Sequence, residues 1–151
     1  MIPILIAQII LFPILASTLM NVWVTSRNTL VLQDAASNLG STLQQTYFAL
    51  DHPTIPNGTE TSNQLGLPPF IDGYSYTANA TLQQSVQSPN SSQVLDITFR
   101  LVSTTFEATS SVVLGPDAQW NPTTVFESNS TNTCVCAEKL NGTVELWFGD
   151  Q

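Results

Sequence analysis

The first third of the chain changes from a uniformly apolar pattern to a one-sided one. Residues 1–26 carry no charged side chain, and only scattered prolines, amides and hydroxyls interrupt the apolar run. Over residues 25–50, apolar side chains recur at steps of three and four, the period of an amphipathic helix; they are Leu32, Ala35, Ala36, Leu39, Leu43, Tyr47 and Leu50. The pattern predicts one helix over residues 1–50, apolar all round at first and one-sided afterwards.

Prolines predict where this helix ends and where it bends. Pro53, Pro56 and an Asn-Gly pair follow Leu50 closely and stop any helix. Pro13 is internal, and its ring clashes with the carbonyl four residues earlier in an α-helix. We therefore expect a kink or local melting near residues 9–12.

Beyond residue 50 the hydrophobic period becomes two. Apolar and polar residues alternate over 95–101, as a strand with one buried face requires. The Asn141-Gly142 pair favours a two-residue hairpin turn. Further strands are expected at 73–80, 105–114, around 125–126, 133–139 and 144–148. This predicts an α+β chain with a long helix over 1–50 and a small antiparallel, Ig-like β-sandwich over 51–151.

Composition changes the picture of what this domain contacts. Charged residues make up only 9% of the 151 residues, and three cationic side chains face eleven acidic ones, for a net charge of −8. Fifteen Ser, nineteen Thr and eleven Asn supply the water-facing groups instead. A chain with so few cations lacks the basic surface that phosphate binding needs, so nucleic acid is not an expected partner.

The opening apolar run is long enough to span a bilayer as a helix of about 20 residues. A removable signal peptide is disfavoured, because such a peptide has a positive start and a shorter apolar core. A buried helix of a soluble domain is also disfavoured, since the rest of the chain is too small to cover every face of it. A retained membrane anchor fits the hydropathy.

Two kinds of modification site stand out in the later part of the chain. Five Asn-x-Ser/Thr sequons predict N-linked glycans, which would hydrate a surface that has few charges; they are at Asn57, Asn79, Asn90, Asn129 and Asn141. Cys134 and Cys136 are the two cysteines, two residues apart on one face of an expected strand. A strained disulfide and two buried free thiols both remain open for this pair.

The residues that usually carry catalysis are scarce. His52 is the single histidine, and it follows the helix directly, as a solvent-facing junction residue would. We find no Gly-rich phosphate loop, no G-x-S-x-G elbow and no metal-ligand spacing. We expect no enzyme activity, no metal and no cofactor, with N-linked glycans as the covalent addition.

In overall plan the chain resembles a mature archaeal type IV pilin or its relative, the archaellin. The resemblance rests on the start MIPILIAQIILFPILA, on the switch to an amphipathic helix, and on the Ser/Thr/Asn-rich β domain with its sequons. In such proteins a peptidase removes a short charged leader, so the mature chain begins with the apolar helix. Leu5 stands where bacterial type IV pilins usually carry a glutamate, which favours the archaeal branch.

The resemblance implies a structural subunit of an extracellular helical filament at the cell surface, used for adhesion or attachment. Its partners would be copies of itself, the membrane before assembly, and the pilus assembly machinery. The filament core would be formed by Ile4, Leu5, Ile9, Leu11, Phe12, Leu15, Leu19, Val22 and Trp23. The alternative is a single-span, membrane-anchored surface protein whose β domain binds a ligand or partner.

Overall fold

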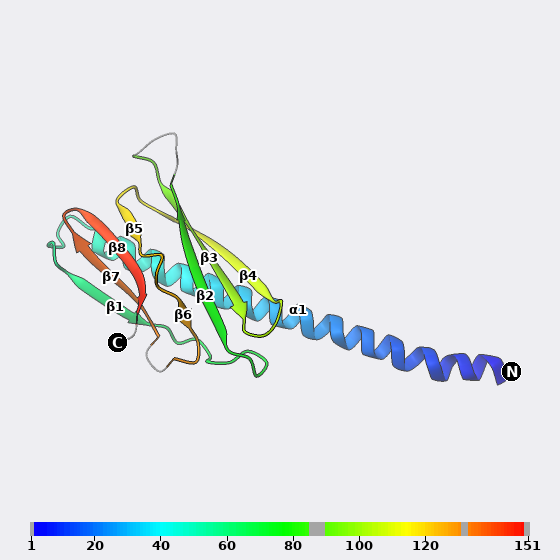
Figure 1. The fold of residues 1–151 in the computed structure, drawn as a ribbon. Coiled ribbons are helices and arrows are strands. Elements are labelled where there is room, and N and C mark those ends of the chain that lie inside the picture. Colours follow the sequence, from blue (N-terminus) through cyan, green and yellow to red (C-terminus); the bar gives the residue numbers. More distant parts are fainter. Residues whose placement is uncertain (1, 85–89, 131–132, 150–151) are drawn as a thin grey trace.

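The computed structural model describes residues 2–84, 90–130 and 133–149. Within these ranges the chain forms one helix, α1 (Ile2–Asp51), and the elements that follow it are strands (Figure 1). These are β1 (Glu60–Gln64), β2 (Tyr76–Gln83), β3 (Gln93–Leu101), β4 (Glu107–Leu114), β5 (Ala118–Trp120), β6 (Phe126–Glu127), β7 (Cys134–Leu140) and β8 (Thr143–Gly149). The predicted α+β class is confirmed. Met1 and Thr131, the third residue of the Asn129 sequon, lie outside the described residues.

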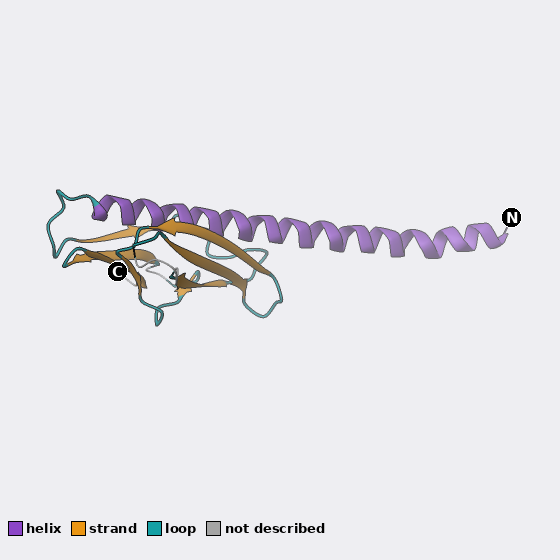
Figure 2. Cartoon of the chain, turned by 90° about the horizontal axis from the view of Figure 1, so that it is seen from above, coloured by secondary structure: helices purple, strands orange, loops and turns teal. Residues whose placement is uncertain are grey.

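Helix α1 runs without interruption through Pro13, so local melting near residues 9–12, the alternative to a kink, is wrong, whereas the kink itself stays a prediction. Every residue on either side of the proline remains helical, and Figures 1 and 2 show gentle curvature without a sharp break. A proline removes one backbone hydrogen bond, and the neighbouring turns of a long helix can hold the helical path with a slight bend. The predicted end is confirmed to within one residue, at Asp51.

The strands form two four-stranded sheets, with the orders β1-β7-β8-β5 and β4-β3-β2-β6. The expectation of purely antiparallel pairing is wrong at one place, because β5 runs parallel to β8. Strands β1 and β5 were not predicted. The sequence of β1, ETSNQ, has no apolar residue, and β5 is only three residues long, so neither produces a periodic signal.

The other strands are found where alternation predicted them, with shifted ends. The strand expected at 73–80 begins only at Tyr76, because Asp72 and Gly73 adopt positive φ in a tight turn before it. The expected hairpin is confirmed: Asn141 and Gly142, with φ of 50° and 82°, join β7 to β8. Positive φ at both positions is the signature of a type I′ turn.

One apolar core joins the second part of α1 to both sheets. Leu32, Leu39, Leu43 and Tyr47 have no exposed surface and lie in one cluster with residues of the strands. Beyond the helix, the two sheets meet through the rings of Tyr76, Phe99, Phe126, Phe148 and Trp120, with neighbouring centroids 4.8–6.2 Å apart. Figure 2 shows the strands gathered along one side of the helix.

Candidate functional site

The N-terminal half of α1, which we call the apolar segment (residues 2–24), projects away from the strands. Figures 1 and 2 show it extending beyond them to the N-terminus. None of the most apolar 18-residue stretch of the helix is buried. The nine residues expected in a filament core are all in this segment, and their side chains are 55–75% exposed. An isolated copy of the chain therefore presents a long, uncovered apolar rod.

The apolar segment has the dimensions of a membrane span. By length and composition α1 is long and apolar enough to cross a membrane. Residues 4–23 alone extend over about 30 Å at 1.5 Å per residue, which is the thickness of a bilayer's hydrocarbon core. Trp23 lies at the end of this stretch, and the guanidinium of Arg27 lies 5.7 Å from its ring centroid. The chain is thus compatible with a location at a membrane or cell surface.

The remainder of the helix, the docked segment (residues 25–51), is fastened along the edge of β4. The Gln33 side-chain amide donates a hydrogen bond of 3.2 Å to the carbonyl of Thr109, and Gln44 donates one of 3.0 Å to the carbonyl of Val113. β4 is an edge strand whose outer carbonyls would otherwise be unpaired. The two amides therefore cover this sheet edge and fix the helix against it. In the sequence both residues are simply polar positions outside the apolar stripe, and their role is not visible there because the edge they bind is distant in sequence.

The helix end is held by a second set of polar contacts. The Lys139 ammonium donates a 3.0 Å hydrogen bond to the carbonyl of His52, at the helix terminus where carbonyls lack helical partners. The Tyr47 hydroxyl donates to the Asp117 carboxylate. Burial, helped by that carboxylate, raises the pKa of Tyr47, and a hydrogen bond to Asp117 together with desolvation raises the pKa of Asp51.

The face of α1 that points away from the strands stays exposed along the whole helix. Leu30 and Phe48, in the docked segment, have 67% and 56% of their surface exposed. At about 100° per residue, both lie in line with Trp23 and Phe12 of the apolar segment. The uncovered surface therefore continues past the apolar segment as a stripe on the outer side of the helix.

All five sequon asparagines are exposed in the structure. Asn79 lies in β2 between two buried alanines, so its side chain points to the solvent face of the sheet. The Asn57 side-chain oxygen accepts a 3.3 Å hydrogen bond from the backbone of Gly142. Asn90, Asn129 and Asn141 lie in turns. Each asparagine is accessible to a glycan, and each lies outside the helix.

The two cysteines are free and buried in β7. Their sulfur atoms are 2.9 Å apart, and the Cys134 thiol lies 3.0 Å from the carbonyl oxygen of Gly149. Burial and the neighbouring thiol raise the pKa of Cys136 to about 12. A thiol with this pKa is almost fully protonated near neutral pH, which makes it a poor nucleophile and metal ligand.

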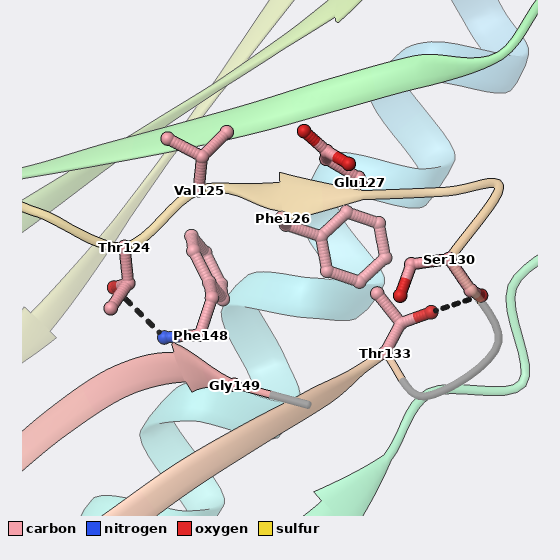
Figure 3. A pocket seen from close by; sticks show the side chains of 8 residues that line it. All are labelled: Thr124, Val125, Phe126, Glu127, Ser130, Thr133, Phe148 and Gly149. Carbon is pink, nitrogen blue, oxygen red and sulfur yellow. Dashed lines mark hydrogen bonds between the residues drawn. The ribbon is translucent and has the colours of Figure 1, made fainter. Parts of the chain in front are cut away.

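A hollow of about 330 Å³ opens between β6 and the end of β8 (Figure 3). Its walls include the rings of Phe126 and Phe148, which are themselves nearly buried, and the carboxylate of Glu127 is the titratable group among the lining residues. Thr124 accepts a 3.1 Å hydrogen bond from the Phe148 backbone. Across the described ranges, no group of three or more His, Cys, Asp or Glu side chains is placed to hold a metal ion.

Comparison of the chain with known protein families, with curated proteins and with solved structures found no match. The features that bear on function are therefore the projecting helix and the head, by which we mean the docked segment together with β1–β8.

Proposed function

We propose that the chain is a structural subunit of an extracellular helical filament of the archaeal type IV pilin kind, with a role in adhesion or attachment. In this proposal the apolar segment forms the filament core and the head forms its outer layer. One observation carries the proposal: the apolar segment is not buried, and it continues without a break from the docked segment, which is part of the head's own core.

The energetics favour a partner for the apolar segment. Its exposed Leu and Ile side chains are Ile2, Ile4, Leu5, Ile6, Ile9, Ile10, Leu11, Ile14, Leu15 and Leu19. Full burial of such a side chain is worth roughly 1.5–3 kcal/mol, and these residues are 52–71% exposed, so on the order of 10–20 kcal/mol per subunit is unrealised in water. A bilayer supplies this burial before assembly. Transfer from lipid to a helix bundle adds only packing, so the assembly machinery would have to supply work.

Parallel helices packed side by side with an axial offset make heterologous contacts, which propagate as an open filament instead of closing. The strands are attached to the docked segment and leave the apolar segment free. In a bundle of apolar segments the heads would therefore lie around the outside. Exposed hydroxyls, amides and glycans on the heads would then form the hydrated outer surface. We also propose an Ig-like relationship for the head, supported by two facing sheets with an aromatic core.

A packing variant that stays apolar tests the proposal. Phe12 is 75% exposed in the subunit, so Phe12→Ala leaves the head's stability unchanged and keeps the segment fit for a membrane. In a filament core the same change removes a buried ring, and filaments should dissociate at a lower temperature or denaturant concentration. Val113→Ala, at an exposed position on β4, is the matched control.

The measurement is electron microscopy of sheared surface material from cells that produce each variant, followed by thermal dissociation of the filaments. The proposal expects filaments of this chain, weakened by Phe12→Ala and unaffected by Val113→Ala. Detergent-soluble single copies and no filaments from the wild-type chain would contradict it and favour a single-span surface protein.

A further inference from the structure

Only two charged residues lie in α1 before its last residue, and both are on its outer face. They are Arg27 and Asp34. At about 100° per residue, both lie within roughly 40° of the direction opposite the buried stripe of Leu32, Leu39 and Leu43. Both residues are exposed. The stripe that runs from Trp23 through Leu30 to Phe48 thus carries one cation and one anion among apolar and small polar side chains.

In the part of the chain that the structure describes, neither charge has an ion-pair partner. Among the described residues the ion pair present joins Arg100 to Glu107 on the head, at 3.8 Å. Arg27 lies over the Trp23 ring, and no described carboxylate lies within ion-pair distance of its guanidinium. Arg27 and Asp34 are seven residues apart, which is about 10.5 Å along a helix axis and too far for an ion pair on one helix.

Assembly would change the surroundings of both charges. If the heads surround a bundle of helices, the helix face opposite the head points toward the bundle axis. Arg27 and Asp34 would then lose most of their contact with water, and an unpaired charge in such a place is costly. Each charge therefore needs an opposite charge from another copy.

We propose that Arg27 of one copy forms an ion pair with Asp34 of a second copy, which is offset by two helical turns, about 10.5 Å, along the filament axis. This inference rests on the proposed filament function and adds the axial register of the contact. Each copy would offer Arg27 to one neighbour and Asp34 to another. Such a head-to-tail contact repeats along the filament without closing.

The pair would select one offset among those that the apolar segment alone permits. A rod that is apolar on every face packs almost equally well at offsets that differ by one turn, about 5.4 Å. A shift of one turn moves the two charges apart by that distance and leaves both of them unpaired. The charges would thus specify register, as a single polar residue does in a coiled coil.

Charge reversal tests the pairing. Arg27→Glu should abolish or strongly reduce filaments, because two carboxylates would face each other, and Asp34→Lys should do the same with two cations. The double variant Arg27→Glu/Asp34→Lys restores opposite charges at the same offset and should recover filaments. The matched control reverses the head ion pair, Arg100→Glu/Glu107→Lys, and should assemble like the wild type. The measurement is the number of filaments per cell by electron microscopy, normalised to the amount of subunit in the membrane fraction.

Charge reversal could also disturb insertion of the helix into the membrane, so variants that only neutralise each charge provide a second test. Arg27→Gln and Asp34→Asn should each lower the temperature at which filaments dissociate, since each leaves the partner's charge buried alone. Combining them removes both charges and should recover part of the loss. Single variants that match the wild type, or double variants no better than the singles, would overturn the ion pair. Absence of filaments from the wild-type chain would instead refute the proposed function.

Discussion

Gly40 lies where α1 packs tightly against β3 and β4, and it allows a quantitative test of how the helix docks. A Cβ atom at this position would lie 2.8 Å from Val112 Cγ1, 3.4 Å from Ser110 Oγ and 3.6 Å from Ile97 Cδ1. Non-bonded carbon atoms prefer about 3.5–4.0 Å, so Gly40→Ala creates an overlap of about 1 Å with Val112. Val112 is β-branched, which restricts its χ1 rotation, so its side chain cannot move away easily.

Two opposing terms set the size of the effect. Alanine is favoured over glycine in a helix interior by about 1 kcal/mol. Overpacking of a filled contact costs about 1–3 kcal/mol. The net result for Gly40→Ala is a loss of about 0–2 kcal/mol in the free energy of unfolding of the head, instead of the gain expected at an exposed helical glycine.

A double-mutant cycle isolates the contact. Val112→Ala alone removes two half-buried methyl groups and should cost about 1 kcal/mol. In the double variant Gly40→Ala/Val112→Ala the overlap is gone, so the double variant should be about 1–3 kcal/mol more stable than the sum of the single changes predicts.

The assay is urea unfolding of the full chain in a mild detergent, followed by the fluorescence of Trp120 and Trp147, which lie in β5 and β8. Trp23, in the apolar segment, adds a signal that the docking contact does not change. A stabilised Gly40→Ala variant, or additive single and double variants, would refute the close contact between Gly40 and Val112.

Three further predictions concern the head. The hydrogen bond to Asp117 raises the pKa of Asp51 in the folded head above its ordinary value of 3.8. Protonated Asp51 therefore stabilises the folded head fully below about pH 3.8, and this stabilisation is lost as the pH rises through the raised pKa. Asp51→Asn should therefore flatten the fall in the head's melting temperature above pH 4, whereas the exposed Glu127→Gln should not, and equal profiles would contradict the contact. With its pKa near 12, the Cys136 thiol should not react with a thiol reagent at pH 8 until the protein is denatured. If the protein is denatured without a reducing agent and still shows no reactive thiol, the two cysteines form a disulfide instead. Mass spectrometry of the peptide that contains Asn79 should detect glycan mass, and Asn79→Gln should remove it without changing the melting temperature, since this side chain faces solvent.

Much of this fold follows from local pattern. The three- and four-residue steps of Leu32, Leu39 and Leu43 predicted both the docked segment and the face it buries. The alternation in β3 and the Asn141-Gly142 turn were equally readable, because a strand with one buried face and a type I′ turn each impose a local residue preference.

The remaining features depend on contacts between residues far apart in sequence. β1 has a polar sequence and is a strand because it pairs with β7, and β5 runs parallel to β8 because of where the chain returns after β4. The roles of Gln33 and Gln44 depend on which sheet edge lies beside the helix. At Pro13 the local preference for a break yields to the continuity of a long helix.

For the candidate site, sequence alone located the apolar segment and disfavoured its burial, but it did not show where along the helix the strands begin to cover it. A helix of the same composition buried in a larger domain has the same hydropathy, and only the placement of the strands beside residues 25–51 leaves residues 2–24 uncovered. That Arg27 and Asp34 lie on the helix face opposite the strands is also known only from the structure, because it depends on which face of α1 the strands cover.

Cryo-electron microscopy of native filaments from cells that produce this chain would show directly whether the apolar segments of many copies pack together. We expect a central bundle of parallel helices traceable to residues 2–24 of many copies, with the heads and their glycans outside it. Finding the protein only as single copies in the membrane, each with its apolar segment surrounded by lipid and in contact with no other copy, would contradict the account.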